Sequence, residues 1–373
     1  MIVLHLIPHL VKGGAERQLM YLATYWARAG REVHVAYLAG TPVPDEIAAS
    51  GVRLHPIAHA GNYDPMLFVR LVRLIRQLKP DLVHTWLLQM DILGGLAAML
   101  TKTPWLLREP VSGAFWTGGL KTRLRRWLGA RADAIVSNSA GGDAYWSAVK
   151  PARQRFIIGN VVPLDEIDAS PKTPVESLGF SDSRPVIMSA GRLDEQKNFA
   201  VMIRGLAGVI DQIGAGAVIF GEGPLRGHLE ALIRELGMEG KILLPGMIPS
   251  IWGALKSAQT FVSLSRYEGH PNAVLEAMAC GCPLILSDIP SHREFLDETT
   301  AILIERYEDP DALANAVLEV IADGEAASAR SRAARARLGL GHNVATISGK
   351  YEEVYETIIA RRMSATGEVA SSS

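Results

Sequence analysis

Short apolar runs alternate with longer segments of helical periodicity along nearly the whole chain, and this alternation constrains the fold more than any other feature. In the first part of the chain, runs typical of buried strands lie at residues 2–7, 33–38, 82–84, 105–107 and 134–137. Segments typical of amphipathic helices lie between them, at 15–28, 65–78, 90–100 and 140–149. Strands that alternate with helices favour a parallel sheet covered on both faces. We therefore predict a doubly wound α/β domain.

The alternation stops between residues 163 and 184, where prolines and acidic residues are frequent, and then resumes. Strand-like runs follow at 186–190, 217–220, 242–244, 260–263 and 284–287. We predict an amino-terminal Rossmann-like domain (1–162), a linker (163–184) and a carboxyl-terminal Rossmann-like domain (185–343), which suits a length of 373 residues. A late helix is expected at about 344–362, and the small polar residues of 364–373 predict a disordered tail.

Charge and cysteine content narrow the classes of partner and compartment. The chain has 38 basic and 39 acidic residues, so its formal net charge of -1 gives no reason to expect a nucleic-acid partner. Cys280 and Cys282 are too close together for a structural disulfide and too few for a zinc site, which fits a reducing compartment. The apolar start lacks a basic leader, and no long apolar run follows, so neither a signal peptide nor a membrane span is expected.

The segment 266–283 (RYEGHPNAVLEAMACGCP) carries the strongest functional signal. It follows a strand-like run and opens a helix, and Pro271 suits the first helical position. The amides of Asn272, Ala273 and Val274 would then have the positive end of the helix dipole behind them. Such a helix start predicts an anion site.

Two glutamates accompany this helix start, Glu268 in the preceding loop and Glu276 in the helix itself. One carboxylate can contact a sugar while the other accepts hydrogen bonds from ribose hydroxyls, a role that acidic residues also have in dinucleotide-binding folds. Alternatively, Glu276 caps the helix or pairs on its surface, and Glu268 is an ordinary loop residue.

Cationic residues follow the first strand of the second domain, in the segment 189–198 (SAGRLDEQKN). Arg192 offers a planar guanidinium to phosphate oxygens, and Lys197 offers a mobile point charge. Together they would neutralise a diphosphate where no metal does so. Alternatively, the segment is a solvated turn in which Arg192 pairs with Asp194 or Glu195.

Two glycine-containing turns are candidates for further contacts with a ligand. Residues 12–17 (KGGAER) lie between a strand and a helix, where glycines allow a close approach of the backbone to a ligand. A plain tight turn is the alternative. Residues 220–227 (FGEGPLRG) miss the dinucleotide fingerprint by one residue and are predicted to shape a turn.

These segments resemble those of the family 4 retaining glycosyltransferases, of the bacterial cell-surface or exopolysaccharide type. The resemblance rests on Gly13-Gly14-Ala-Glu, on Gly191-Arg-Leu with Lys197-Asn, and on Glu268-Gly with Glu276-Ala-Met-Ala. The motifs occur in the family's order and extend over most of the chain. They imply the GT-B fold, in which two Rossmann-like doubly wound parallel-sheet domains face a central cleft, with the terminal helix crossing back to the first domain.

The resemblance implies a role for each matched residue. Arg192 and Lys197 would bind the donor diphosphate and stabilise the leaving nucleotide, and Glu268 would contact the transferred sugar. Glu276 would hold the ribose. The other implied donor contacts are Gly14, Gly246, Met247, Gly269, His270, Asn272, Ala273 and Val274.

One departure from the family affects the acceptor side. Many members carry a histidine near the sugar in the first domain, but here no histidine lies between His84 and His228. Arg108 or Glu109 is expected to take its place, and His84 is expected at a strand end facing the cleft.

The reaction implied is transfer of a sugar from a nucleotide diphosphate sugar, with UDP or GDP as the nucleotide, to a glycan or lipid-linked acceptor. The family favours displacement with retention, in which the leaving phosphate helps to deprotonate the acceptor and the protein positions the reactants. No cofactor is required on this view, and the protein works in the cytoplasm. The one Asp-x-Asp match, Asp309-Pro-Asp311, is predicted to cap a helix rather than bind a metal.

Residues of about 115–131 combine cations with aromatic and leucine side chains at helical spacing. A basic amphipathic helix of this kind can lie on an anionic membrane surface. Such a contact would place the protein at the inner face of the cytoplasmic membrane. The competing interpretation, which the sequence favours, is a domain helix that buries its Leu/Trp face.

Three other functions remain open on the sequence alone. A nucleotide-sugar epimerase of similar architecture would share the diphosphate site. A non-catalytic sugar-binding protein is the second, although such proteins are usually exported. A nicotinamide dehydrogenase is the third, although neither domain carries the strict glycine fingerprint.

Overall fold

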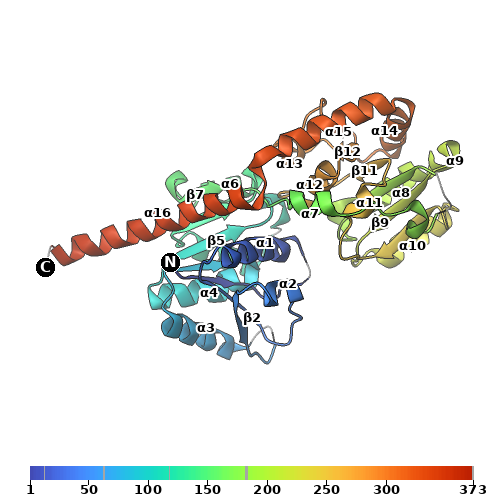
Figure 1. Cartoon of the computed structure of the whole chain (residues 1–373). Coiled ribbons are helices and arrows are strands. Elements are labelled where there is room, and N and C mark those ends of the chain that lie inside the picture. The colour runs from blue at the N-terminus through green and yellow to red at the C-terminus, as the bar shows by residue number, and fades with distance from the viewer. Residues whose placement is uncertain (12, 62–63, 117, 181–183, 372–373) are drawn as a thin grey trace. The chain divides into compact units, whose positions relative to one another are not determined.

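The structure is a computed structural model of the chain (Figure 1), and it describes residues 1–11, 13–61, 64–116, 118–180 and 184–371. It divides into two compact units. Unit 1 comprises Met1–Val161 and Gly341–Ser373, and unit 2 comprises Val162–Leu340. Within the described ranges, no helix has both the length and the apolar character that crossing a membrane requires.

Unit 1 is built on a seven-stranded parallel sheet of order β3-β2-β1-β4-β5-β6-β7. Its strands are β1 (Val3–Leu6), β2 (Val33–Leu38), β3 (Arg53–Ile57), β4 (Leu82–Thr85), β5 (Trp105–Glu109), β6 (Ala134–Ser137) and β7 (Arg155–Ile157). Its helices are α1 (Gly14–Arg28), α2 (Asp45–Ala48), α3 (Pro65–Leu78), α4 (Leu87–Thr101), α5 (Leu120–Gly129), α6 (Ala140–Ser147) and α16 (Val344–Ser371). Two short turns complete the unit's described elements: η1 (Gly113–Phe115), between β5 and α5, and η2 (Ala152–Gln154), between α6 and β7.

The terminal helix α16, red in Figure 1, belongs to unit 1 and packs beside α1. Ile347, Tyr351 and Tyr355 are buried there in the same core as Leu19 and Leu22 of α1. The predicted disordered tail at 364–373 requires correction, because α16 continues to Ser371. No proline occurs in the helix to end it. Residues 372 and 373 lie outside the described residues.

Two buried histidines face each other in the middle of this sheet. His5 on β1 is the register partner of His84 on β4, and their ring centroids are 5.1 Å apart. Trp86 Nε1 donates to His5 Nδ1 at 3.3 Å, and His84 Nδ1 lies 2.9 Å from the Tyr355 hydroxyl. Burial, aided by the charge of His34, lowers the pKa of His5 to about 3. Burial likewise holds the pKa of His84 well below its usual range.

Unit 1 is expected to lose stability as the pH falls below about 6.5, the usual pKa of an exposed histidine. Above that pH both rings are neutral in the folded and unfolded states. Below it the unfolded chain binds protons that the folded state does not, until the pH approaches the folded pKa. The free energy of unfolding should fall by up to about 1.4 kcal/mol per pH unit for each ring.

Urea unfolding at about pH 7.5 and about pH 5.5 tests this dependence. The loss of stability between the two pH values should be smaller for His5→Leu than for the wild type by about 1 kcal/mol. His228 is exposed, and His228→Leu should keep the wild-type loss. An equal loss in wild type and His5→Leu would contradict the prediction.

Unit 2 contains a six-stranded parallel sheet of order β10-β9-β8-β11-β12-β13. Its strands are β8 (Val186–Ala190), β9 (Gly216–Phe220), β10 (Ile242–Gly246), β11 (Thr260–Ser263), β12 (Leu284–Ser287) and β13 (Ile302–Ile304). The helices are α7 (Leu164–Ala169), α8 (Phe199–Ala207), α9 (Ile210–Ile213), α10 (Arg226–Glu235), α11 (Trp252–Leu255), α12 (Asn272–Ala279), α13 (Pro290–Arg293), α14 (Pro310–Ala322) and α15 (Gly324–Leu338). Three short turns complete the unit's described elements: η3 (Val175–Leu178), η4 (Glu195–Lys197) and η5 (Gly339–Gly341), which reaches into unit 1.

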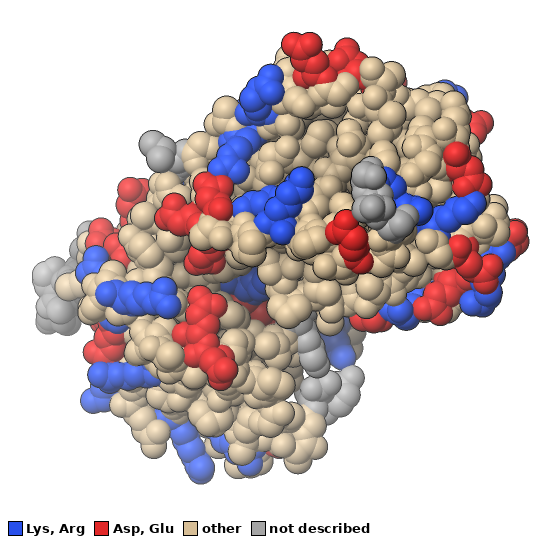
Figure 2. Space-filling view, turned by 45° about the vertical axis from the view of Figure 1, so that its right-hand side comes forward, with Lys and Arg blue, Asp and Glu red and all other residues tan. Residues whose placement is uncertain are grey.

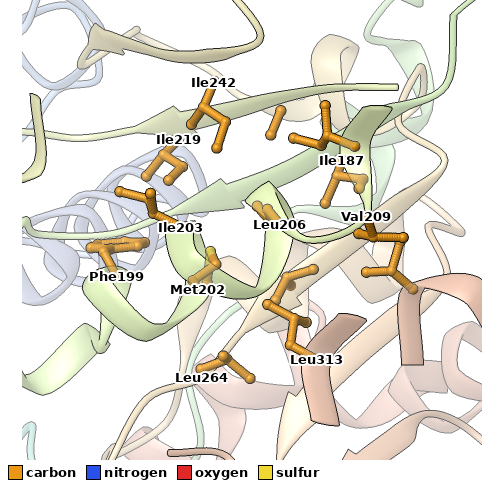
Figure 3. Packing of buried hydrophobic residues seen from close by; sticks show 14 of the residues in the cluster. Ile187, Phe199, Met202, Ile203, Leu206, Val209, Ile219, Ile242, Leu264 and Leu313 are labelled. Atoms are coloured by element: carbon orange, nitrogen blue, oxygen red, sulfur yellow. The ribbon is translucent and has the colours of Figure 1, made fainter. Parts of the chain in front are cut away.

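The two faces of this sheet bury separate apolar clusters. On one face, Phe199, Met202 and Ile203 of α8 pack with strand residues such as Ile187 and Ile219 (Figure 3). On the other face, α12 contributes most of its residues to a second cluster. Cys282 is buried in that cluster as a small apolar residue, and burial raises the pKa of its thiol. Both clusters hold the strand ends of unit 2 in fixed positions.

The segment predicted as a linker, 163–184, is instead part of unit 2 as far as it is described. Ile167 of α7 and Phe180 are buried in the cluster beneath α12. The ring of Phe180 occupies the space where a side chain at Gly216 would lie, 2.6 Å from its Cβ position. The prolines prevent a long helix in this segment, but they do not prevent its apolar side chains from packing.

Candidate active site

The sheet of unit 2 has a topological switch point between β8 and β11. The strand order runs one way from β8 to β10 and the other way from β11 to β13. Parallel α/β sheets bind ligands beyond the carboxyl ends of their strands at such points. The loops that leave β8 and β11, residues 191–198 and 264–271, contain five of the predicted site residues: Arg192, Lys197, Glu268, Gly269 and His270.

Hydrogen bonds join these two loops into one surface. The Arg266 amide donates to the Gln196 carbonyl at 2.9 Å, and its guanidinium donates to the Glu195 carbonyl at 2.7 Å. In the reverse direction, Gln196 Nε2 donates to the Tyr267 carbonyl at 2.8 Å. The loop after β8 therefore fixes the position of the loop after β11.

Glu268 and Lys197 form an ion pair where these loops meet. Glu268 is only 6% exposed. Besides Lys197, its carboxylate accepts hydrogen bonds from Ser265 Oγ at 2.7 Å and from Gln196 Nε2 at 3.2 Å. A buried carboxylate needs partners of this kind to remain charged. The two residues that the sequence assigned to sugar and phosphate are thus direct neighbours.

Further contacts, which the sequence did not predict, support Glu268 from α13. Ser291 Oγ donates to the Glu268 carbonyl oxygen at 2.8 Å. The next residue, His292, is fully buried, and its Nδ1 lies 2.7 Å from the Ser287 carbonyl. Burial lowers the pKa of His292, while that hydrogen bond opposes the shift. Ser265 could have been noticed from its place just before Glu268, but no motif marks Ser291 or His292.

Arg192 is the exposed cation of the site, because its side chain is 72% accessible. Its guanidinium lies 3.5 Å from Asp194 Oδ2, a long contact for an ion pair at the surface. Glu195, the other suggested partner, contacts Arg266 at 3.4 Å instead. Arg192 therefore remains accessible to a ligand beside the Lys197–Glu268 ion pair.

Glycines allow the loops after β8, β9 and β10 to touch. The Gly221 amide donates to the Gly246 carbonyl, and the Gly191 amide donates to the Phe220 carbonyl, both at 2.9 Å. Gly221 has a φ of 144°, and a Cβ there would lie 1.9 Å from the Gly191 carbonyl oxygen. The segment 220–227, predicted to form a turn, therefore lies against the loop after β8. Met247 follows Gly246 and is 67% exposed.

Helix α12 begins beside the ion pair, at Asn272. Pro271 lies one residue before the helix, not in its first turn as predicted. Ala273 is partly exposed and Val274 is buried. Glu276 is 5% exposed, so the alternative that it pairs on the helix surface is wrong.

The remaining predicted donor contacts lie in two places. Gly269 is buried in the loop before α12, and the half-buried His270 has its ring centroid 5.5 Å from that of Phe295. In unit 1, Gly14 is the first residue of α1 and is partly exposed, after Gly13 in an extended conformation. Lys12 of the same motif lies outside the described residues.

The three acceptor-side candidates require correction, because they are core residues of unit 1. His84, Arg108 and Glu109 are each at most 1% exposed. His84 contacts the Tyr355 hydroxyl from α16, and Arg108 Nη2 donates to Asn160 Oδ1 at 2.6 Å. Glu109 accepts hydrogen bonds from buried neighbours on α5 and α6. Their side chains hold unit 1 together and do not form a surface for an acceptor.

The Asp-x-Asp match is a helix cap, as predicted. Asp309 Oδ1 accepts a hydrogen bond from the Asp311 amide at 3.0 Å, at the start of α14. Across the described ranges, the side chains of His, Cys, Asp and Glu form no group of three or more that could hold a metal ion.

Both halves of the chain match known families. Residues 173–337 match the family described as glycosyl transferases group 1, and residues 12–166 match glycosyltransferase family 4. The chain is 29% identical over 252 residues to the N-acetylgalactosamine-N,N'-diacetylbacillosaminyl-diphospho-undecaprenol 4-alpha-N-acetylgalactosaminyltransferase of Campylobacter jejuni, covering 65% of this chain and 67% of that protein. It is 29% identical over 308 residues to the putative glycosyltransferase EpsF of Bacillus subtilis, covering 77% and 79%.

Among solved structures, HepE of Anabaena in complex with UDP-glucose has the same fold. The TM-score is 0.83 at 19% identity, over 98% of this chain and 100% of that chain. The two parallel-sheet units thus correspond to the two domains of the GT-B fold. Matches to both halves, in the same order as the motifs, show that the chain belongs to family 4 of the glycosyltransferases.

Proposed function

We propose that the protein transfers a sugar from a nucleotide diphosphate sugar to a glycan or lipid-linked acceptor, with retention of anomeric configuration, during synthesis of surface polysaccharide or glycolipid in the cytoplasm. The observation that carries this proposal is the ion pair between the partly exposed Lys197 and the buried Glu268, beside the exposed Arg192, at the switch point of unit 2. The Campylobacter relative's name includes a diphospho-undecaprenol acceptor, and the HepE structure contains UDP-glucose, which support the acceptor and donor classes.

The donor diphosphate would bind between Arg192 and Lys197. The Lys197 ammonium has three N–H groups, and the pair with Glu268 uses one of them. Arg192 can add a bidentate contact from the exposed side. The amides of Ala273 and Val274 at the start of α12 supply the favourable end of a helix dipole. These groups would stabilise the charge that develops on the leaving nucleotide without a metal ion.

The sugar and the nucleoside would lie on either side of the diphosphate. Glu268, held by Ser265 and Gln196, would accept hydrogen bonds from hydroxyls of the transferred sugar. Glu276 would bind the ribose, and the loop at Gly246 and Met247 would contact a uracil or guanine base. With the sugar so fixed, the leaving phosphate could accept the proton of the acceptor hydroxyl on the same face, which gives retention.

Thermal unfolding with nucleotides tests the donor site. The purified protein is heated with UDP, GDP, ADP, TDP or NAD, with EDTA present throughout. One nucleoside diphosphate is expected to stabilise the protein by about 2.7 kcal/mol at about a hundred times its dissociation constant. Arg192→Ala and Glu276→Ala should reduce that effect, because each removes a proposed contact.

Arg204→Ala is the matched control, since Arg204 is an exposed arginine on α8 in the same unit. It should respond to the nucleotide as the wild type does. A response to NAD alone would support a dehydrogenase instead, and no response to any nucleotide would reject the donor site. A second series without EDTA should give the same stabilisation, and stabilisation seen only in that series would contradict metal independence.

A further inference from the structure

Helix α5 presents its apolar residues to solvent. Leu120 is 83% exposed, Leu124 is 39% exposed and Trp127 is 55% exposed, whereas Leu128 is fully buried. Leu120, Leu124 and Trp127 are spaced by four and three residues, so their side chains lie on one side of the helix. The sequence favoured a helix that buries its Leu/Trp face, and the structure corrects that expectation.

The orientation of α5 is fixed by a buried arginine. Arg125 donates from Nε to Asp91 Oδ2 at 2.7 Å and from Nη1 to Glu109 Oε2 at 2.6 Å, and the side chains of all three are fully buried. The Arg125 guanidinium also lies 4.4 Å from the centre of the Trp116 ring. Rotation of α5 to bury its apolar side would break both ion pairs inside unit 1. The exposed side is therefore a stable feature of the fold.

Cations surround the exposed side of α5. Lys121, Arg123 and Arg131 are exposed, and Arg131 stacks on Trp127 at 3.6 Å. Residues 110–132 include four lysines and arginines besides the buried Arg125 and no acidic residue, in a chain with a net charge of -1. By contrast, the face drawn in Figure 2 carries basic and acidic side chains close together. The positive charge on α5 is thus a local feature of this segment.

We propose that this surface docks unit 1 on an anionic lipid membrane. We call it the α5 face and define it as Phe115, Leu120, Lys121, Arg123, Leu124, Trp127 and Arg131; Thr117, in the same segment, lies outside the described residues. Its chemistry is that of an interfacial helix, whose apolar side chains enter the acyl boundary while its cations bind lipid phosphates.

A lipid surface fits the α5 face better than a protein does. Stable protein interfaces bury about 800 Å² on each partner and draw on about 20–30 residues. The α5 face consists of one short helix and Phe115, which precedes it in the sequence and is 44% exposed. Lipid phosphates supply the negative charge that its cations require. The docking does not depend on sugar transfer, but it would bring the protein to a lipid-linked acceptor.

Cosedimentation of the full-length protein with vesicles tests the proposal. One set contains phosphatidylcholine alone, and the other also contains phosphatidylglycerol. Wild type should bind the anionic vesicles and bind neutral vesicles more weakly. Leu120→Ser/Trp127→Ser should lower the affinity at least about tenfold, because two large apolar side chains no longer enter the lipid. Lys121→Glu/Arg123→Glu should lower it by a similar or larger factor and weaken its salt dependence.

Matched controls come from other helices of unit 1. Arg73→Glu/Arg76→Glu makes the same change of charge on exposed residues of α3, and Met99→Ser/Leu100→Ser removes exposed apolar side chains from α4. Both should bind vesicles as the wild type does. The proposal is overturned if wild type does not bind anionic vesicles, if the α5 variants bind equally well, or if those variants instead abolish a dimer of this chain. The α5 variants should still be stabilised by the nucleotide as the wild type is. The vesicle test of the α5 face can therefore fail or succeed independently of the nucleotide test of the donor site.

Discussion

Arg125→Met is expected to lower the free energy of unfolding of unit 1 by about 3–5 kcal/mol, because it leaves two buried carboxylates without their cation. Asp91 and Glu109 are both fully buried beside Arg125. Even with that partner, burial raises the pKa of Asp91 to about 6. Without Arg125, the carboxylates of Asp91 and Glu109 have to be protonated or hydrated, and hydration would disrupt the packing around β5.

Urea unfolding followed by the tryptophan fluorescence of unit 1 measures this effect. Arg123→Met is the control, since Arg123 is exposed two residues away on the same helix and should change stability by less than about 0.5 kcal/mol. Adding Asp91→Asn to Arg125→Met should recover part of the loss, because it removes one of the uncompensated charges. A loss below about 1 kcal/mol for Arg125→Met would show that the buried pairs contribute little.

The central strands of both sheets and the edge strand β10 were predicted from the sequence, whereas the edge strands β3, β7 and β13 were not. Strands such as β1 and β8 are covered on both faces, so they are apolar apart from one residue each, His5 and Ser189. The edge strand β3 contains Pro56 and is mostly accessible, and β7 and β13 have only three residues each. Short edge strands carry little apolar signal and tolerate proline. The number of strands therefore came from the structure.

The site was predictable where its residues lie in contiguous motifs. The segments 189–198 and 266–283 contain Lys197, Glu268 and Glu276 in the loops and helix that follow buried strands. The sequence could not show that Lys197 and Glu268 form an ion pair, because the hydrogen bonds that join their loops link residues about 70 positions apart. The roles assigned to these residues stay predictions.

The errors in unit 1 have a common physical cause, which is long-range packing. Arg108 and Glu109 are polar residues at a strand end, a pattern that suggested a ligand surface. Tyr351 on α16 and Arg125 on α5 hydrogen-bond to them from distant parts of the sequence and enclose them. Periodicity likewise identified α5 as amphipathic but could not tell that Arg125, a charged residue, would occupy its buried side.

Lys197→Ala is expected to lower kcat/KM for sugar transfer by about 10²–10³-fold, the effect of removing one preorganised donor from developing negative charge. The Lys197 side chain is 19% exposed, so water only partly screens its charge. The same substitution removes one partner of the Glu268 carboxylate, which still accepts hydrogen bonds from Ser265 and Gln196.

Glu268→Gln separates the two effects of Lys197. Glutamine retains the size of the side chain and can still accept hydrogen bonds from Ser265 or Gln196, but it lacks the negative charge. We expect this variant to bind the nucleoside diphosphate as the wild type does while losing transfer of the sugar, because Lys197 remains available to the phosphate. Lys197→Ala should weaken both.

Lys241→Ala provides the control for loss of a cation, since Lys241 pairs with Asp211 at the surface of unit 2. Initial rates with the nucleotide sugar identified by thermal unfolding should be unchanged in this variant. If Lys197→Ala retains activity within about threefold of wild type, the ammonium does not act on the leaving phosphate, since loss of such a donor has a far larger effect. The ion pair with Glu268 would then serve only to join the two loops of unit 2.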